Sequence, residues 1–287
     1  MDARVDLHTH SDHSDGTLTP TQLVELAAQR AVQLLALTDH DTTAGCASAA
    51  AACVAHGIQF LPACELSSAW RGRELHIVGL RVAPHTPELV EHLRKVHALR
   101  VARLQRIGER LTRCGLDGAG LIGPVLAMPG TPTRLHVARA LVAQGLVADV
   151  EDAFKRYLGR GQRAAVPPEW PAPEACIEVI TRAGGLAVLA HPHRYKLSAG
   201  GLRELCALFR EQGGTGIEVS LPGMGPADAS QAASLARRYG LAGSLGSDFH
   251  EPGLPWRPLG RWLKLADGIT PITQLLGFTP ASTPQPA

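Results

Sequence analysis

Short apolar segments recur along the chain and are separated by longer amphipathic ones. We expect buried strands at residues 4–7, 34–37, 59–61, 75–80, 186–190, 216–219 and 242–245. Between them we expect helices at residues 20–30, 43–56, 173–183, 202–211 and 227–239. Short buried strands that alternate with helices predict a parallel sheet covered by helices. Because no Gly-x-Gly-x-x-Gly follows the first strand, seven such strands favour a closed (β/α) barrel over an open dinucleotide-binding sheet.

A basic stretch interrupts this alternation. Residues 87–113 are expected to form one long helix with leucines on one side and arginines, spaced three or four apart, on the other. Shorter helices are expected around residues 134–144 and 150–158. We therefore predict a helical insertion at residues 99–167 within a discontinuous barrel of residues 1–98 and 168–278. The Pro-rich residues 279–287 are expected to be a disordered tail.

Charge is distributed unevenly between these two parts. The whole chain has a net charge of +2, but residues 94–163 contain 13 Lys and Arg against 5 Asp and Glu. The remainder therefore contains 15 basic and 21 acidic residues. This distribution predicts an anionic substrate. The basic insertion would hold the substrate, and cations bound in the barrel would act on it.

Composition excludes several other classes of protein. A hydrophobic content of 45% and a charged content of 19% argue against a disordered chain. No apolar run approaches the roughly 20 residues of a membrane helix, and no leader precedes the first strand, so we expect a cytoplasmic protein without membrane contact. The six cysteines show no Cys-x-x-Cys spacing, which excludes a zinc ribbon and predicts inert core thiols in a reducing compartment.

Histidine and acidic residues gather at or near the ends of the predicted strands. The candidate metal ligands are His8, His10, Asp15, His40, Glu65, His76, His191, Asp248 and His250. A lone His-x-His predicts little, and Asp39 and Asp41 can be interpreted as solvated turn or capping residues, with Asp39 orienting a neighbour. Since the carboxyl ends of barrel strands meet at one face, the convergence of these residues predicts a site for two or three cations. Without cations, burying these groups would cost several kcal/mol per unpaired charge.

The donor set indicates the chemistry of such a site. Imidazole and carboxylate groups without thiolate suit Mn, Fe or Zn rather than Ca. Multinuclear sites of this kind promote in-line attack on a phosphorus centre by a metal-bound hydroxide. We expect the bound ions to be Mn²⁺, with Zn²⁺ and Fe²⁺ as alternatives.

Five ordered motifs carry a resemblance to a known family. They are Asp-Leu-His-Thr-His with Ser-Asp-Gly, Thr-Asp-His-Asp, the segments around Glu65 and His76, Ala-His-Pro, and Gly-Ser-Asp-Phe-His. Over nearly its whole length the chain resembles the polymerase-and-histidinol-phosphatase (PHP) family of metal-dependent phosphoesterases. The segments that begin at Thr133 and His191 are similar to the nucleoside 3′,5′-bisphosphate phosphatase branch, which includes RNase AM-like 5′→3′ exoribonucleases.

The resemblance implies a distorted (β/α)7 barrel that holds three manganese-like ions. It places His8, His10, Glu65 and Asp248 on the first ion, Asp15, His40 and His250 on the second, and Glu65, His76 and His191 on the third. It also implies hydrolysis of the 3′-phosphate of nucleoside 3′,5′-bisphosphates such as pAp, and exonucleolytic cleavage of short 5′-phosphorylated RNA. The expected catalytic residues are Asp15, Glu65, Asp248 and Arg194. His193 stands where the family commonly has a small residue, so whether His191 or His193 binds the third ion is open.

The expected partners are a nucleotide bisphosphate and short single-stranded RNA, bound by a monomer or weak oligomer. Arg134 and His136 are expected to hold one phosphate while the ions act on the other, because guanidinium groups grip phosphate bidentately. Arg160 and His193 are further candidate substrate contacts, and His193 or Arg194 is a candidate general acid unless a metal-bound water suffices. For Arg139, Lys155 and most of the arginine stripe, we prefer a solvated helix face.

Three alternative functions stay open at this stage. A histidinol phosphate phosphatase would share the barrel and the ions but has less need of a basic insertion. A C–N amidohydrolase on a similar barrel would not need the excess positive charge beside the site. A degenerate barrel that binds nucleic acid without catalysis is disfavoured because every motif position is retained.

Overall fold

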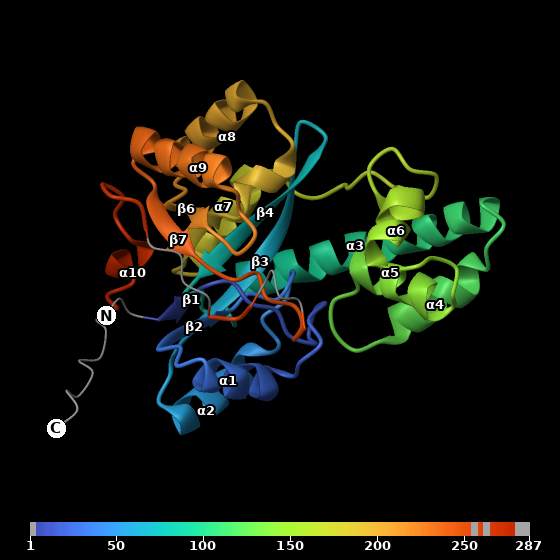
Figure 1. The fold of residues 1–287 in the computed structure, drawn as a ribbon, viewed down its shortest axis with the longest axis horizontal. Coiled ribbons are helices and arrows are strands. Elements are labelled where there is room, and N and C mark those ends of the chain that lie inside the picture. Colours follow the sequence, from blue (N-terminus) through green and yellow to red (C-terminus); the bar gives the residue numbers. More distant parts are fainter. Residues whose placement is uncertain (1–3, 254–257, 261–264, 279–287) are drawn as a thin grey trace.

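The computed structural model describes residues 4–253, 258–260 and 265–278, and the predicted disordered tail lies outside them. Within these residues, one sheet contains seven strands in sequence order. They are β1 (Val5–Asp6), β2 (Leu34–Leu37), β3 (Gln59–Trp70), β4 (Arg73–Leu80), β5 (Leu186–Leu189), β6 (Gly216–Ser220) and β7 (Ala242–Leu245). The two edges meet where the Leu7 N–H donates to the Leu245 carbonyl and Thr9 pairs in parallel with Phe249. The predicted barrel is therefore confirmed, in a nearly closed form (Figure 1).

The expectation of an entirely parallel sheet is wrong at β4. This strand pairs antiparallel with both β3 and β5, whereas the other neighbouring strands are parallel. The cause is the two-residue turn at Arg71 and Gly72, whose φ angles of 48° and 68° suit a tight hairpin. β3 also extends beyond the predicted residues 59–61, so that Glu65 lies inside the strand opposite Val78.

Helices cover the outside of the barrel (Figure 1). The first begins at a capping box formed by Thr19 and Gln22, with Pro20 in its first turn, and buries Leu23 and Val24. The helices of this layer are α1 (Pro20–Gln29), α2 (Cys46–His56), α7 (Pro173–Arg182), α8 (Ala199–Glu211), α9 (Pro226–Tyr239) and α10 (Ile272–Leu275), with the short 3₁₀ turn η2 (Pro192–Tyr195) after β5.

The helical insertion has a hydrophobic core separate from the barrel interior. Its elements are α3 (Pro87–Arg113), α4 (Gly118–Ala127), α5 (Arg134–Ala143), α6 (Val150–Ala153) and the π-helical turn η1 (Phe154–Leu158). α3 runs from the barrel into the insertion (Figure 1), where Leu104, Ile107 and Leu111 pack against Leu121 and Leu141. The Gly-rich α4 was not expected from the sequence, and the boundaries at residues 99 and 167 stay a prediction.

Candidate metal centre

All nine predicted ligands converge at one end of the barrel. Among the described residues, their ligand atoms form overlapping groups within which every atom lies within 4.8 Å of the others. These groups are His10–Asp15–His40–His250, His8–Glu65–His191, His8–His10–Asp248 and His40–Glu65–His76. In the family sets only Glu65 is shared, whereas these groups also share His8, His10 and His40.

The loop that carries Asp15, residues 11–16, is held on its barrel side by Asp39. The Asp39 carboxylate accepts hydrogen bonds from the Ser11 N–H at 2.7 Å and from the hydroxyl groups of Ser11 at 2.6 Å and Ser14 at 2.7 Å. Asp39 thus orients its neighbours, which was one of the two predicted interpretations. We call residues 11–16 the Asp15 loop. A side chain at Gly16 would place a Cβ atom 2.4 Å from the His10 carbonyl oxygen, so the loop closes tightly only with glycine there.

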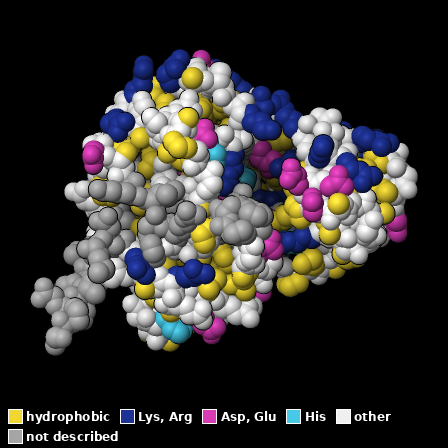
Figure 2. Space-filling model, in the orientation of Figure 1, with side chains coloured by type: hydrophobic (Ala, Val, Ile, Leu, Met, Phe, Trp, Pro, Cys, Tyr) yellow, Lys and Arg dark blue, Asp and Glu magenta, His cyan; other side chains and the backbone are white. Residues whose placement is uncertain are grey.

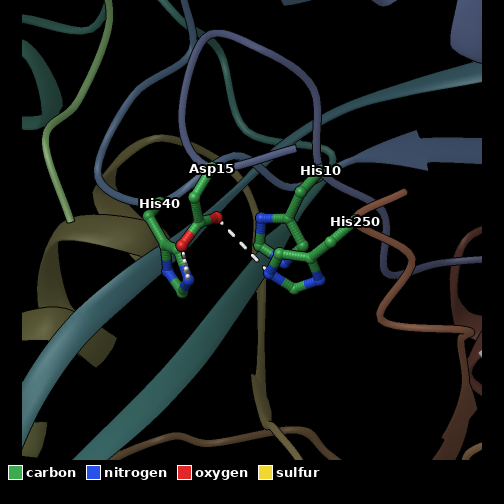
Figure 3. Close-up of side chains that lie close together, drawn as sticks. All are labelled: His10, Asp15, His40 and His250. Carbon is green, nitrogen blue, oxygen red and sulfur yellow. Dashed lines mark ion pairs between the residues drawn. The ribbon is translucent and has the colours of Figure 1, made fainter. Parts of the chain in front are cut away.

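Figure 3 shows the group around Asp15, with its carboxylate between His40 and His250. Asp15 Oδ1 lies 3.3 Å from His250 Nε2, and Oδ2 lies 3.8 Å from His40 Nε2. The rings of His10 and His250 stack with centroids 4.2 Å apart. Burial alone would raise the pKa of the Asp15 carboxyl, but His40 and His250 hold that pKa well below its usual range. Asp15 is therefore an ionised carboxylate that faces imidazole nitrogens.

Glu65 lies at the centre of the cluster and is fully buried. Its Oε1 atom is 2.9 Å from His191 Nε2 and 3.0 Å from His76 Nδ1, and its Oε2 atom is 3.0 Å from His40 Nδ1. Burial would raise the pKa of this carboxyl, but the imidazoles of His76 and His8 keep it well below the usual range. Both oxygens of Glu65 can therefore serve as negatively charged ligands to different positions.

Glu218 on β6 is a site residue that the sequence interpretation missed. Its Oε1 atom is 2.6 Å from His8 Nδ1, and its Oε2 atom accepts from the His191 N–H at 2.5 Å. If the His8 Nδ1–H donates to the carboxylate, the lone pair of Nε2 faces the cluster, as expected of a metal-ligating histidine. A single carboxylate within an otherwise apolar strand was the available signal.

Two of the proposed ligands have a strained backbone conformation. His191 and Asp248 have φ angles of 25° and 51°, a region that residues other than glycine rarely adopt. Next to His191, the Tyr195 hydroxyl accepts from the His76 N–H at 3.2 Å and donates to the Ala190 carbonyl. The chain around β4 and β5 is therefore held in the conformation that brings His76 and His191 together.

The cluster fits a set of divalent cations better than it fits hydrogen bonding alone. His8 Nε2 and His10 Nε2 lie only 3.1 Å apart, so one cation could contact both nitrogens together with Asp248. Several buried atoms also make no hydrogen bond of normal geometry among the described residues, although most of them lie close to an oppositely charged group: Asp15 Oδ1, His40 Nδ1, Glu65 Oε2, His76 Nδ1 and His191 Nδ1. Buried polar groups are rarely left unsatisfied, and cations would satisfy these nitrogen and oxygen donors.

A cleft opens between this cluster and the insertion (Figure 2). Arg134, at the start of α5, lines both parts of the cleft, and its Nη2 atom donates to Glu74 Oε2 at 2.7 Å. Glu74 also accepts from Arg103 at 3.0 Å and from the Trp170 indole N–H at 2.8 Å. Burial would raise the pKa of Glu74, but Arg134 and Arg103 hold it below its usual range. Arg134 is therefore pre-oriented toward the cleft by a fixed carboxylate.

The remaining predicted substrate residues lie in different surroundings. Arg194 lines the metal side of the cleft and pairs with Asp248. His193 is half-buried and belongs to none of the candidate metal groups among the described residues, so the geometry favours His191 as a ligand. The Nδ1 atom of His136 accepts from the Thr133 N–H at 3.1 Å and caps α5, while Arg160 is exposed on the loop after η1.

The preference for a solvated arginine face is wrong near the middle of α3. Arg100 and Arg103 are each only 7% exposed. Arg100 donates to Asp41 Oδ2 and to the Ser67 hydroxyl, both at 2.7 Å, and Asp41 is itself buried rather than a solvated turn residue. Arg139 is also not simply solvated, because its Nη1 atom donates to the Asp15 carbonyl at 2.8 Å.

Further along α3, Arg106 and Arg113 are exposed as the solvated face predicts, whereas Arg110 is half-buried and donates to the Ala165 carbonyl. Arg106 is exposed and pairs with the exposed Glu169. Lys155, on η1, is likewise exposed. In the part of the chain that is described, we find no helix with the length and apolar character needed to cross a membrane.

The comparisons with known proteins agree with this geometry. The family profile of the PHP domain matches residues 6–113. The chain is 44% identical over 272 residues to the 5′-3′ exoribonuclease Rnm of Escherichia coli, covering 94% of this chain and 92% of that protein. It is 40% identical over 273 residues to the 3′,5′-nucleoside bisphosphate phosphatase of Chromobacterium violaceum, covering 94% and 95%. A solved structure described as an amidohydrolase from Chromobacterium violaceum, with bound sulfate and no metal, has a TM-score of 0.90 and 39% identity over 97% of this chain and 99% of that one.

Proposed function

The chain belongs to the PHP family of metal-dependent phosphoesterases, and from this premise we propose that it hydrolyses the 3′-phosphate of nucleoside 3′,5′-bisphosphates. The product is a nucleoside 5′-monophosphate. We propose that the same site removes 5′-terminal nucleotides from short 5′-phosphorylated RNA. Both reactions break a phosphate ester at the 3′ oxygen of a nucleotide that carries a 5′-phosphate. One site can therefore catalyse both, and relatives at 40–44% identity carry one or the other activity in their names.

The observation that carries this proposal is the convergence of nine donor side chains beside a cleft with a pre-oriented guanidinium group. We propose three Mn²⁺ ions, held by the ligand sets that the family resemblance implies, with Glu65 shared between two of them. When bound, such ions would polarise the phosphoryl oxygens and acidify water for in-line attack. Asp15, Glu65 and Asp248 act as the anionic ligands that hold these charges in place, and Arg194 orients Asp248.

The insertion supplies the second point of attachment. We propose that Arg134 binds the phosphate that is not hydrolysed, since its side chain lines the cleft and is 30% exposed. His136 follows it on α5, with one ring nitrogen occupied by capping and the ring also close to the Ser14 backbone, and it stays a predicted phosphate contact. His193 and Arg160 stay predicted contacts. Because a bisphosphate offers two anionic groups, it can be gripped by the insertion and the metal centre at the same time.

Product analysis of the Mn²⁺-loaded protein tests the proposed function. We expect adenosine 3′,5′-bisphosphate to yield adenosine 5′-monophosphate and inorganic phosphate. We expect a short 5′-phosphorylated oligoribonucleotide to be shortened from its 5′ end by single nucleotides. Release of the 5′-phosphate instead, or no hydrolysis of either substrate with any divalent ion, would contradict the proposal.

The alternative functions are less well supported. Histidinol phosphate has one phosphate and leaves the Arg134 side of the cleft without an anionic partner. A C–N hydrolase is suggested by the name of one solved structure, but the curated relatives over the same length are a nucleotide phosphatase and exoribonucleases. Comparing the release of phosphate from a bisphosphate and from histidinol phosphate, and of amine from amides, separates the three.

The cellular setting stays a prediction. All six cysteines, which lie in the described part of the chain, are free thiols, as expected in a reducing compartment such as the cytoplasm. A monomer or weak oligomer also stays a prediction, and sedimentation analysis would test it.

A further inference from the structure

The insertion contacts the Asp15 loop directly, in addition to facing the cleft. The Thr131 N–H donates to the His13 carbonyl at 2.8 Å. Arg139, on α5, donates from Nη1 to the Asp15 carbonyl at 2.8 Å. Both contacts go to main-chain carbonyls, so they fix the path of the loop itself. The Asp15 loop consists of turns rather than regular secondary structure, so its conformation depends on such contacts.

Gly130 shows how closely the two backbones approach. Its φ angle is 91°, and a Cβ atom at this position would lie only 2.7 Å from the His13 carbonyl oxygen and 3.1 Å from that of Asp12. Real Cβ atoms essentially never approach another atom so closely. A side chain here would therefore push the insertion away from the Asp15 loop, or displace the loop.

Arg139 also reaches the segment that supplies a second ligand of the same group. Its Nη2 atom lies 3.7 Å from Glu251 Oε2, and Glu251 directly follows His250 in the chain. The Arg139 side chain is 27% exposed, so it is partly shielded from solvent at this junction. One side chain of the insertion thus lies between the two segments that carry Asp15 and His250.

We propose that Arg139 is a positioning residue that couples docking of the insertion to ion binding by the group His10, Asp15, His40 and His250. The inference rests on the proposed metal centre. When Arg139 holds the Asp15 carbonyl, the carboxylate of Asp15 is kept facing His40 and His250. Because coupling free energies are reciprocal, an ion bound by this group also stabilises the docked insertion.

Metal titration of an Arg139→Ala variant tests the coupling. We expect one equivalent of Mn²⁺ to bind about 10–100-fold more weakly than in the wild type, the usual effect of losing a group that orients a ligand. Arg139→Lys should recover part of this affinity, because an ammonium group can donate to the same carbonyl. Arg156→Ala is the matched control, since Arg156 lies in the same insertion and contacts Leu146 and Asp152 there. Equal Mn²⁺ affinity in wild type and a folded Arg139→Ala variant would overturn the proposal.

A pair of glycine variants tests the contact between the insertion and the Asp15 loop without changing charge. Gly130→Ala should weaken the binding of one equivalent of Mn²⁺, because the added methyl group meets the His13 carbonyl. Gly115→Ala introduces the same strain at a φ of 85°, but with no atom within 4 Å of the new Cβ, and should bind Mn²⁺ like the wild type. Equal weakening in both variants would overturn the proposal, because strain alone would then explain the loss.

The wild-type protein provides a test that needs no variant. Hydrogen exchange of the amides in residues 130–143 should slow when Mn²⁺ is added, while amides in residues 118–127, at the far side of the insertion, change less. Unchanged exchange at residues 130–143 under saturating Mn²⁺ would overturn the coupling but not the metal centre. A wild-type protein that binds no Mn²⁺ by elemental analysis would overturn the metal centre and, with it, the coupling.

Discussion

At the scale of single residues, Glu218 accepts hydrogen bonds from two of the proposed ligands, His8 and His191. Glu218→Gln keeps the size of the side chain but replaces one carboxylate oxygen by an amide N–H₂ group. This group would face either the His191 N–H or the His8 Nδ1–H, so that two hydrogen-bond donors would meet and one hydrogen bond would be lost. We expect Mn²⁺ affinity to fall about 10–100-fold. Equilibrium dialysis with elemental analysis measures this change. Glu178→Gln on α7, where the carboxylate is exposed and pairs with Arg182, should leave the affinity unchanged.

Arg134 tests the proposed two-point binding of the substrate. Arg134→Ala removes a charge-assisted hydrogen bond to a phosphate, worth about 1.5–3 kcal/mol, so kcat/KM for a nucleoside bisphosphate should fall about 10–150-fold. Steady-state kinetics with the metal content measured in parallel would show this. Arg156→Ala removes an arginine from an exposed face of the insertion and should keep wild-type kinetics. If Arg134→Ala retains full turnover of the bisphosphate with its ions bound, two-point binding is wrong.

Cys46 gives a prediction for the dependence of stability on pH. Burial raises the pKa of this thiol from 9.0 to about 11. The unfolded chain therefore releases the thiol proton at lower pH than the folded chain. The contribution of Cys46 to the free energy of unfolding is fully present below pH 9 and is lost as the pH rises through about 11. Between pH 9 and about 11, the free energy of unfolding should fall further in the wild type than in Cys46→Ala, by on the order of 2 kcal/mol. Urea unfolding at several pH values measures it, and parallel pH profiles would contradict the prediction.

At the scale of elements, α3 joins the barrel to the insertion through a buried ion pair. Arg100 lies near the middle of the helix and donates to Asp41, which follows β2, and to Ser67 on β3. Removal of one partner leaves the other charge buried without compensation. α3 is therefore fixed to the barrel by charge as well as by apolar packing.

Substitution of Arg100 measures the strength of this connection. Arg100→Ala should lower the free energy of unfolding by about 3–5 kcal/mol, because the buried Asp41 carboxylate loses its partner. Denaturant unfolding provides the measurement. Arg106→Ala on the same helix, where the ion pair with Glu169 is exposed, should cost less than about 1 kcal/mol. Similar losses for both arginines would show that the Arg100 pair is no stronger than a surface pair.

At the scale of the whole molecule, the proposed ions should stabilise the fold. Their ligands come from β3, β4 and the segments after β1, β2, β5 and β7, so ion binding ties together parts of the chain that are far apart in sequence. An ion that binds only the folded state adds about 2.7 kcal/mol at a concentration 100-fold above its Kd. Each ion should therefore raise Tm by about 5–10 °C.

Thermal unfolding with Mn²⁺ and with a chelator tests this expectation. The Tm should rise with added Mn²⁺ and return to the metal-free value after chelation. A protein stripped of metal and titrated back provides the control for irreversible damage. If Tm is the same with saturating Mn²⁺ and with chelator, the cluster does not bind ions preferentially in the folded state.

The sequence by itself determined the barrel class and the positions of the proposed ligands. Apolar segments of three to six residues alternate with amphipathic ones, and this pattern depends only on neighbouring residues. Because the ends of such strands meet at one face, the polar residues that follow them could be predicted to converge. Short motifs such as those around His8 and Asp248 added the family resemblance.

Only the tertiary structure decided the direction of β4, the role of Glu218 and the burial of Arg100. The hairpin at Arg71 and Gly72 depends on backbone angles that the apolar pattern does not encode. Whether a charged side chain is buried depends on its partners, and those partners are distant in sequence: Arg100 and Asp41 are 59 positions apart, and Glu218 and His8 are 210 apart. Local patterns cannot show such pairs, because burial of a charge is made tolerable only by a group that the complete fold brings beside it.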